Sequence, residues 1–540
     1  MSNAQNNDSN TYDYIVVGGG SAGCIVAGRL AEAGAGSVLL LEGADRAEAN
    51  PETLSADGFK YAFANDKVML DRMSAEQAHC GSRTLYAGSG RGMGGSGSVN
   101  GMVYTRGDQL DFAQWPTGWQ WQDVEPTFIQ LEERLRPRHR EGTAFTELAL
   151  NAAEAAGFQR KHGLNDGHLN GFMGYNDMNY EGDKRRSSYV AFVAENTSAA
   201  LTVKTKSLVQ KILFDDQQRA TGVEVSLNGK TQRLNARCEV VLCAGALETP
   251  KLLMLSGVGP KEHLQSLNIP LVKDVQSIGS NLQDHPNVSL FFQGRKPVDF
   301  RYPQVYGFTR CNPALELPAQ QADTCFAWLA APVTMQQSMT RMAPATLLKG
   351  QKFFNPVLKG LIRCALKIAL LLPPVNRFIN NLYGVVIILG KPLSRGTLRL
   401  ASRNAKDPAV IDLAYFSNAT DMETMINGVE LAKKMGAHEG LKNWGNRLMA
   451  PPTRSSKREV LKKWIINTSM TTFHYCGTCS MGEQADAPVD TQLKLKGIAG
   501  LRIADASAIP VIPVSALNAP SMMLAHRAAD FILQDAKIAQ

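Results

Sequence analysis

A glycine-rich turn near the start of the chain restricts its fold more than any other feature. The apolar run Tyr12–Val17 leads into residues 18–23, GGGSAG, which fit the pattern G-x-G-x-x-G. A helix-like stretch to about Ala33 follows, and a second apolar run, Ser37–Leu41, ends at Glu42. Strand, turn, helix, strand and acid therefore occur in the order that a dinucleotide-binding unit requires.

Each part of this unit has a physical role. The glycines let the backbone turn tightly, and they let a pyrophosphate approach the amides at a helix N-terminus, where the helix dipole favours negative charge. Glu42, about 20 residues beyond the turn, can accept hydrogen bonds from a ribose diol. The unit predicts that the chain binds an adenine dinucleotide.

Composition sets wider bounds on the class of protein. The 540 residues can bury a large core, and 44% apolar with 20% charged residues is typical of a globular protein. The net charge is +8, but the chain has no strongly basic tail and no interleaving of basic and aromatic residues. We therefore do not expect nucleic acid as a partner.

The expected location follows from the start of the chain and from its cysteines. The first ten residues, MSNAQNNDSN, are polar, and no stretch is long and apolar enough to span a bilayer. The nine cysteines are an odd number and are scattered, as expected of reduced thiols. We expect a cytoplasmic protein, with peripheral contact at the inner face of the membrane as an alternative discussed below.

Two later regions contain further strands. Residues 200–245 form a β-rich block that ends in a small-residue turn, and residues 501–507 form a short strand that leads to Asp505. A final helix is predicted at about Ser521–Gln534. If these strands share a sheet with the first unit, the dinucleotide domain is discontinuous, and the intervening chain supplies a substrate domain.

An unusual stretch lies within that intervening chain. Residues 353–372 are mostly apolar, yet Lys359, Arg363 and Lys367 recur at every fourth position, which places three cations on one helical face. Pro373-Pro374 is expected to end the helix. Such a helix can lie in a membrane interface or form the mouth of a substrate channel. We favour a helix that packs on its apolar face and exposes the basic stripe.

Four segments resemble the glucose-methanol-choline (GMC) family of flavoprotein oxidoreductases. Residues 90–107 read GRGMGGSGSVNGMVYTRG and residues 245–259 read GALETPKLLMLSGVG. Near the C-terminus, residues 471–482 read TTFHYCGTCSMG and residues 501–532 read LRIADASAIPVIPVSALNAPSMMLAHRAADFI. The resemblance extends from about Tyr12 to Leu533 and is weakest over residues 295–390.

The resemblance implies FAD as the cofactor and an α/β fold. A Rossmann-like FAD-binding domain is joined to a substrate domain that has an antiparallel sheet covered by helices. The division that it implies assigns residues 12–150, 196–292 and 471–540 to the FAD domain. It assigns residues 151–195 and 293–470 to the substrate domain.

The resemblance also implies which residues hold FAD. The glycine turn and Ser21 would hold the pyrophosphate, Glu42 the ribose and Val209 the adenine, and the 90–107 segment would line the isoalloxazine. The full set of cofactor-binding residues is Gly18, Gly20, Ser21, Ala22, Gly23, Glu42, Met93, Gly94, Gly95, Asn100, Gly101, Met102, Val103, Val209, Phe473, Asp505 and Ala506. No metal site is predicted.

The mode of FAD attachment can also be predicted. Some members of the family bind FAD covalently through a histidine directly before the asparagine of the first motif. That position is Val99 in this chain, and valine has no nucleophile. We therefore expect non-covalent FAD.

Oxidation of an alcohol by hydride transfer needs a base for the hydroxyl proton, and histidine, with an ordinary pKa of about 6.5, suits that role. Of the nine histidines, His474 occupies the position of the family's catalytic base, whereas His285 is expected to be structural. The second active-site residue implied by the resemblance is Asn518, whose amide would orient the substrate oxygen.

The expected reaction is the oxidation of a primary alcohol, aliphatic or aromatic, to its aldehyde. His474 would take the hydroxyl proton while the α-hydride passes to flavin N5. The electrons would then reach oxygen or a quinone-like acceptor, which makes the enzyme an alcohol oxidase or, as we slightly favour, an alcohol dehydrogenase. The amphipathic segment 353–372 would allow peripheral membrane contact.

Two other functions are weighed against this one. Cys476 and Cys479 form a C-x-x-C pair beside His474, and flavoenzymes that exchange electrons with dithiols carry such pairs. A few relatives use the same scaffold as lyases, including light-driven fatty-acid photodecarboxylases. We expect neither to be the main activity.

Overall fold

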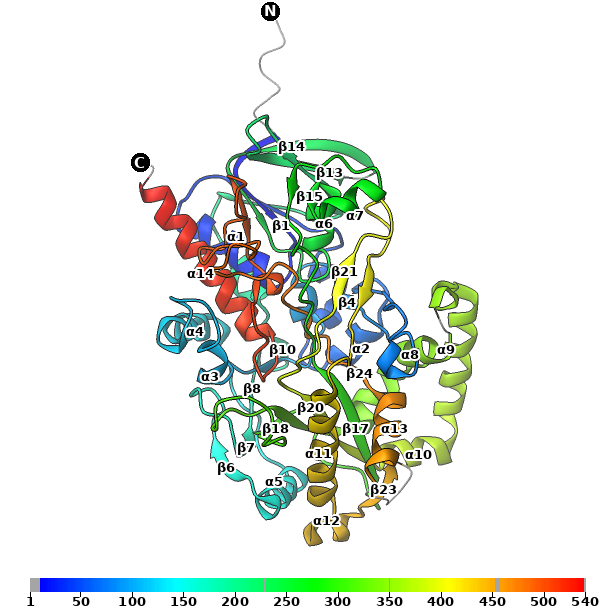
Figure 1. The fold of residues 1–540 in the computed structure, drawn as a ribbon. Coiled ribbons are helices and arrows are strands. Elements are labelled where there is room, and N and C mark those ends of the chain that lie inside the picture. The colour runs from blue at the N-terminus through cyan, green and yellow to red at the C-terminus, as the bar shows by residue number, and fades with distance from the viewer. Residues whose placement is uncertain (1–9, 228, 349, 452–456, 539–540) are drawn as a thin grey trace, which may run out of the picture.

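The computed structural model describes residues 10–227, 229–348, 350–451 and 457–538, so the polar start of the chain, residues 1–9, lies outside the described residues. Within them the chain forms an α/β fold with two large sheets, one in each half of the molecule (Figure 1). None of the described helices is both long enough and apolar enough to cross a membrane.

The first sheet has the strand order β11-β2-β1-β14-β13-β12, with β25 beside β14. Strands β11, β2, β1, β14 and β25 are parallel, and β12, β13 and β14 form an antiparallel meander. This arrangement confirms that the first unit, the β-rich block and the C-terminal strand share one sheet. The bounds are β1 Thr11–Val17, β2 Val38–Leu41, β11 Leu201–Lys204, β12 Ser207–Phe214, β13 Ala220–Leu227, β14 Lys230–Leu242 and β25 Leu501–Ile503.

Two long helices cover this sheet beside the glycine turn. Helix α1 (Ser21–Glu32) begins at the turn, and α14 (Asn518–Ile538) packs along it, although the two are far apart in the sequence (Figure 1). Arg29 links them by a 2.8 Å ion pair with Asp530. The predicted strand–turn–helix–strand unit is therefore β1–α1–β2.

The second sheet has the order β23-β17-β20-β19-β18-β7-β6, with β24 beside β17, and among its described strand pairs only β6–β7 is parallel. Helices α5 (Ala144–Ala156) and α11 (Ala419–Gly436) pack against it, as the predicted substrate domain requires. Strand β17 pairs in this sheet, although the sequence-based division assigns it to the FAD domain. The bounds are β6 Gln159–His162, β7 Phe172–Tyr175, β17 Pro286–Gln293, β18 Val305–Thr309, β19 Thr324–Ala330, β20 Leu382–Leu389, β23 Arg447–Ala450 and β24 Met470–Thr471.

The amphipathic segment, residues 353–372, forms helix α9 (Pro356–Leu371), which lies with α8 (Ala331–Leu347) and α10 (Pro373–Asn380) on one flank of the molecule (Figure 1). The helix ends before Pro373, as predicted. Its orientation is opposite to the one that we favoured from the sequence. Lys359 and Arg363 point inward to Asp71 and Asp66, at 2.8 and 2.7 Å, and the apolar residues face solvent.

The remaining α-helices and strands lie outside these two sheets. The helices are α2 Phe59–Ala64, α3 Gln109–Phe112, α4 Trp121–Leu135, α6 Thr249–Leu255, α7 Lys261–Ser266, α12 Glu439–Trp444 and α13 Arg458–Thr468. The strands are β3 Met69–Leu70, β4 Ser89–Gly90, β5 Val103–Tyr104, β8 Asp177–Met178, β9 Tyr180–Glu181, β10 Lys184–Arg185, β15 Val258–Gly259, β16 Lys273–Asp274, β21 Thr397–Arg399 and β22 Val410–Asp412.

Candidate active site

The predicted dinucleotide residues gather where parallel strands of the first sheet end. The glycine turn follows β1, Glu42 follows β2, Gly245 follows β14 and Asp505 follows β25. Ligands of open α/β sheets bind at this carboxyl edge, because the helix N-termini point there. The fold thus brings together residues from both ends of the chain.

Glu42 is held by backbone amides. Its Oε2 accepts a hydrogen bond from the Gly19 amide at 2.9 Å, and its Oε1 accepts from the Ala44 and Gly92 amides, each at 3.0 Å. A carboxylate has about four acceptor positions, so Oε2 retains one. Glu42 therefore fixes the glycine turn and can still accept a bond from a ribose hydroxyl.

Asp505 has a different arrangement. Its Oδ2 accepts hydrogen bonds from the Gly245 amide and the Thr249 hydroxyl, and its Oδ1 accepts from the amide and hydroxyl of Ser507. All four acceptor positions are thus used within the protein. Asp505 therefore links the segments that follow β14 and β25. A cofactor contact in this segment would have to come from neighbouring groups such as Ala506.

The segment that contains the first family motif lies directly against the glycine turn. The Gly94 amide donates to the Gly19 carbonyl at 2.7 Å, and a Cβ on Gly95 would lie only 2.8 Å from the Gly20 Cα. Glycine at these positions therefore allows the two loops to touch. This contact places the predicted isoalloxazine-lining residues beside the predicted pyrophosphate site.

Arg185 supports this segment, and the sequence analysis did not find it. Its guanidinium donates to the Asn100 side-chain oxygen at 2.7 Å, to the Asn100 carbonyl at 2.6 Å and to the Gly97 carbonyl at 3.0 Å. Complete burial lowers the pKa of Arg185 to about 9. The only local signal is its place in a short basic run, which is more typical of a solvated surface.

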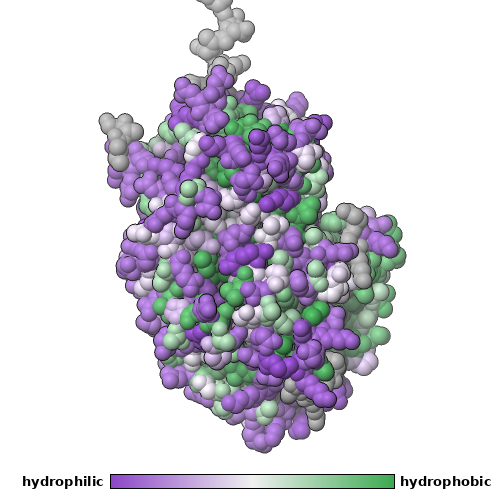
Figure 2. Space-filling view, viewed as in Figure 1, coloured by the Kyte–Doolittle hydropathy of each residue, from purple (hydrophilic) through white to green (hydrophobic). Residues whose placement is uncertain are grey.

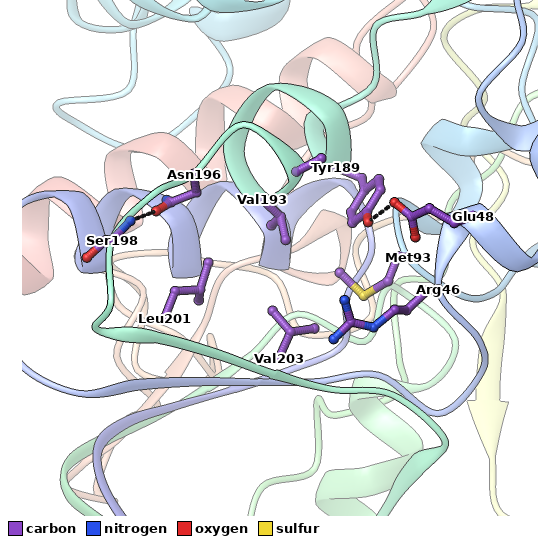
Figure 3. Close-up of a pocket in the computed structure, with 10 residues that line it drawn as sticks. Arg46, Glu48, Met93, Tyr189, Val193, Asn196, Ser198, Leu201 and Val203 are labelled. Atoms are coloured by element: carbon purple, nitrogen blue, oxygen red, sulfur yellow. Dashed lines mark hydrogen bonds between the residues drawn. The ribbon is translucent and has the colours of Figure 1, made fainter.

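Two further features lie in the first half of the molecule: Val209, which is predicted to contact the adenine, and a cavity. Strand β12, which contains Val209, begins with hydrogen bonds between residues 206–207 and the Glu42–Ala44 segment. The contact of Val209 with the adenine stays a prediction. A cavity of about 360 Å³ lies between β11 and the short helix η6 (Val190–Ala194) (Figure 3). Met93 and Tyr189 help line it but His474 does not, so it is separate from the candidate base.

His474 follows β24 and is held at its backbone by Asp284. The His474 amide donates to Asp284 Oδ1 at 2.8 Å, and the hydroxyls of Thr471 and Tyr415 donate to Asp284 Oδ2. Phe473, just before the histidine, has a positive φ of 64°. The hydrogen bonds to Asp284 hold the chain beside Phe473, whose backbone conformation is uncommon. Such conformations are typical of functional sites.

The ring of His474 contacts His285, which the sequence analysis expected to be structural. The two Nδ1 atoms are 2.9 Å apart, and His285 Nε2 is 3.0 Å from the Gly390 carbonyl oxygen. A carbonyl only accepts, so His285 carries its proton on Nε2 and its Nδ1 accepts the Nδ1–H of His474. The Nε2 of His474 is then left with a lone pair.

Burial sets the charge state of these three groups. It lowers the pKa of His474 to about 4 and the pKa of His285 well below its ordinary value. It raises the pKa of Asp284 to about 6, against the effect of its hydrogen bonds. Both histidines are therefore neutral at pH 7, the form in which a histidine can accept a proton.

Asn518 lies at the start of α14, and its side-chain oxygen contacts the glycine turn. Its Oδ1 accepts a hydrogen bond from the Ser21 hydroxyl at 2.8 Å. The structure thus joins Asn518 to the proposed pyrophosphate site and joins His474 to His285. The substrate-orienting role of Asn518 stays a prediction.

The cysteine pair beside His474 is buried. Cys476 and Cys479 are both free thiols with no exposed surface. Burial raises the pKa of both thiols, whereas dithiol chemistry needs an accessible thiolate. The geometry therefore disfavours the dithiol function.

Comparison with known proteins identifies the family. Models of the GMC oxidoreductases match residues 12–287 and 392–525. The chain belongs to the GMC oxidoreductase family. It is 30% identical to an oxygen-dependent choline dehydrogenase of Pectobacterium carotovorum, over 96% of this chain and 94% of the relative. It is 29% identical to a choline oxidase of Arthrobacter globiformis, over 98% and 96%.

A solved structure agrees with this assignment. The pyridoxine 4-oxidase from Mesorbium loti superposes with a TM-score of 0.82 at 25% identity, over 96% of this chain and 98% of that one. GMC oxidoreductases bind FAD and act on CH–OH donors. The predicted cofactor, enzyme class and fold class are therefore confirmed at the level of the family.

The residues of this GMC oxidoreductase fit an FAD pyrophosphate and ribose. At Gly20, the N-cap of α1, the nearest atom to an added Cβ would be 4.0 Å away, and among the described residues none lies within 4 Å of a Cβ on Gly245. The amides at the start of α1 face this open space, and Glu42 keeps a free acceptor beside it.

Proposed function

We propose that this GMC oxidoreductase oxidises a primary alcohol to its aldehyde, with His474 as the general base. The observation that carries the proposal is the hydrogen-bonded series from the Gly390 carbonyl through His285 to His474. This series leaves the unprotonated nitrogen of a neutral, buried imidazole available to a substrate. Histidines that are only structural usually have both ring nitrogens paired.

Different residues of the chain accept the substrate proton, bind the cofactor and position the base. The Nε2 of His474 accepts the hydroxyl proton of the alcohol, which becomes an aldehyde once its α-hydride has also left. FAD supplies the hydride acceptor when it is bound. The glycine turn and Glu42 hold the dinucleotide, the Gly94-Gly95 segment lines it, and Asp284 and His285 keep the base in place.

Aromatic side chains lie next to the base and would give apolar contact to an aliphatic or aromatic alcohol. The ring of Phe473 lies 5.8 Å from Phe63 and 6.1 Å from Tyr86, and Tyr86 lies 5.8 Å from Phe353, measured between centroids. Such a cluster favours aliphatic or aromatic substrates. Choline, the substrate named for the relatives above, is the charged alcohol to compare.

The central experiment is anaerobic bleaching of the flavin by a panel of alcohols of varied chain length and aromaticity, with choline included. We expect bleaching in the dark by an aliphatic or aromatic primary alcohol, with the aldehyde as product. Bleaching by none of them would refute the proposal, and a reaction that needs light would instead favour the lyase alternative.

The electron acceptor is oxygen or a quinone-like compound. We favour the quinone-like acceptor, because an exposed apolar flank, described below, would bring the enzyme to a membrane where quinones dissolve. Admission of air after anaerobic bleaching separates the two cases. Slow return of the yellow colour in air, with fast return on addition of a soluble quinone, is expected of a dehydrogenase.

We predict that FAD is not covalently attached. Val99, at the position of the covalent histidine in some relatives, is buried with Ala62 and Val68 and offers no nucleophile. Precipitation of the holoenzyme with acid should release all of the yellow colour into the supernatant. Colour that stays with the washed pellet would contradict this prediction.

We predict that His285 acts as a positioning residue for His474. His285→Phe removes the acceptor for the Nδ1–H of His474, so the tautomer that leaves Nε2 free is no longer imposed. Flavin reduction should slow by roughly 10- to 100-fold, with little change in the alcohol concentration that gives half-maximal rate. Anaerobic stopped-flow absorbance measures both quantities.

His285→Asn is the matched control, because Asn Oδ1 is as many bonds from the backbone as His Nδ1 and can accept the same hydrogen bond. This variant should recover part of the lost rate. Equal rates in the phenylalanine variant and the unmodified enzyme would show that His285 is only structural.

A further inference from the structure

Helix α9 exposes an apolar stripe on the flank of the molecule, where Figure 2 shows hydrophobic residues gathered. Leu361 is 63% exposed, Ile368 59% and Leu371 80%, and α9 has no buried residue. A contiguous exposed apolar patch marks an interaction surface. We call this surface the docking face and define it as Val357, Leu361, Ile368, Leu371, Leu372 and Phe378.

Ion pairs on the opposite side of α9 hold it in this orientation. Asp66 accepts from Arg363 at 2.7 Å and from Arg341 at 2.8 Å, and Asp71 accepts from Lys359 at 2.8 Å. The hydrogen bonds from Arg363 lower the pKa of Asp66 to about 2, so Asp66 stays charged at neutral pH. The apolar stripe therefore faces outward because the polar side is used for attachment.

The charge around the docking face is of one sign. The sequence has no aspartate or glutamate between Asp323 and Asp407. Lys367 on α9, Arg377 on α10 and Lys352 in the turn before α9 are exposed, and among the described residues none of the three has a carboxylate partner. A surface that combines an apolar stripe with unpaired cations is complementary to an anionic bilayer.

We propose that the docking face binds the surface of an anionic phospholipid bilayer. Helix α9 lies parallel to the membrane plane, its apolar side chains enter the headgroup–acyl boundary, and the three cations contact lipid phosphates. Because no described helix can span a membrane, the contact is interfacial.

A second copy of the chain fits this surface less well. In a two-fold contact each residue of the face meets the same patch on the other copy. Lys367 and Arg377 of one chain would then approach those of the other, with no carboxylate from residues 324–406 to offset the repulsion. Anionic lipid supplies the opposite charge.

The docking face is also on the side of the candidate base. Phe353, from the turn before α9, is buried against Tyr86, and Tyr86 contacts Phe473, the residue before His474. Lys359 of α9 lies 4.5 Å from the centroid of the Phe353 ring. Packed aromatic rings therefore connect the docking face to the candidate base.

The test is co-sedimentation of the holoenzyme with vesicles, either of phosphatidylcholine alone or of phosphatidylcholine with phosphatidylglycerol. We expect binding to the anionic vesicles, weakened by added salt. The triple variant Leu361→Gln, Ile368→Gln, Leu371→Gln should partition at least about 100-fold more weakly. Its FAD absorbance and its rate with a water-soluble alcohol should be unchanged, because the three side chains are exposed.

Two controls match these changes. Ile129→Gln alters an isoleucine that is 48% exposed on α4, at the opposite side of the molecule (Figure 1), and should bind like the unmodified enzyme. Lys367→Gln with Arg377→Gln should weaken binding roughly 10- to 30-fold. The same change at two exposed lysines of the first sheet, Lys211 and Lys230, should have little effect.

Two results would overturn the proposal. One is equal sedimentation of the triple variant and the unmodified enzyme with anionic vesicles. The other is no vesicle binding at all by the unmodified enzyme. If light scattering then shows a dimer that dissociates in the triple variant, the docking face is an interface between two copies of this chain.

Discussion

His474→Ala is expected to slow the reduction of bound FAD by alcohol at least about 100-fold, the usual effect of losing a general base. The alcohol keeps its hydroxyl proton, so little alkoxide character develops to expel the hydride. FAD should remain bound, because the dinucleotide is held at the ends of the parallel strands by other residues. Anaerobic stopped-flow absorbance gives the rate, and the absorbance spectrum gives the FAD content.

The control for this substitution is His162→Ala, which removes an exposed histidine from β6 of the second sheet. It should leave the rate of flavin reduction within a factor of about two, as is usual for surface positions. Near-normal reduction in His474→Ala would refute the assignment of the base.

The pH dependence of the unmodified enzyme provides a second readout of the same residue. Burial lowers the pKa of His474 to about 4, so the ring stays neutral and able to accept a proton well below the ordinary histidine value of 6.5. The loss of kcat/KM attributable to His474 should therefore be centred near pH 4. Between about pH 6.5 and pH 4 the unfolded chain binds a proton at His474 that the folded chain does not, so the stability of the fold should fall as pH decreases through this window.

Much of the fold could be predicted from local patterns. The sequence predicted a strand, a glycine turn, a helix and a second strand, and the structure has them as β1–α1–β2. They could be predicted because each pattern reflects a local requirement of the backbone. The break before Pro373 was predicted for the same reason. Sharing of one sheet by distant strands followed from the family motifs rather than from strand patterns alone.

The orientation of α9 could not be predicted from its own sequence. The pattern gives two helical faces, one basic and one apolar, but it does not say which is buried. Asp66 and Asp71 decide this from a segment far away in the chain, and they attract the basic face inward. Tertiary ion pairs thus override the usual burial of an apolar face.

The parts of the site that sequence reasoning missed depend on the direction of side chains. His285 supports the base only because its Nε2 meets the Gly390 carbonyl, and neither residue has a local signal for this contact. Asn518 sits in the predicted motif, yet its oxygen accepts a bond from Ser21. Motifs locate such residues along the chain, whereas the packing of the two sheets determines their partners.

Two glycine substitutions in the first turn should separate cofactor binding from folding. Gly20 has φ of −74°, and the nearest atom to an added Cβ is 4.0 Å away, so the apoprotein should accept Gly20→Ala without loss of stability. The new methyl group would occupy the space through which the pyrophosphate reaches the amides of α1. We expect FAD affinity to fall at least about 10-fold.

Gly23→Ala should instead lower the stability of the apoprotein, because its Cβ would lie 1.9 Å from the Gly18 carbonyl oxygen and 3.2 Å from Cys243 Cβ. Helix α1 must then move away from the sheet, which should destabilise the apoprotein by about 2 kcal/mol or more. Thermal melts of the apoproteins and FAD titrations distinguish the two effects. Normal FAD affinity in Gly20→Ala would mean that the pyrophosphate does not approach this turn, and an unchanged melting temperature in Gly23→Ala would mean that α1 packs less closely on β1.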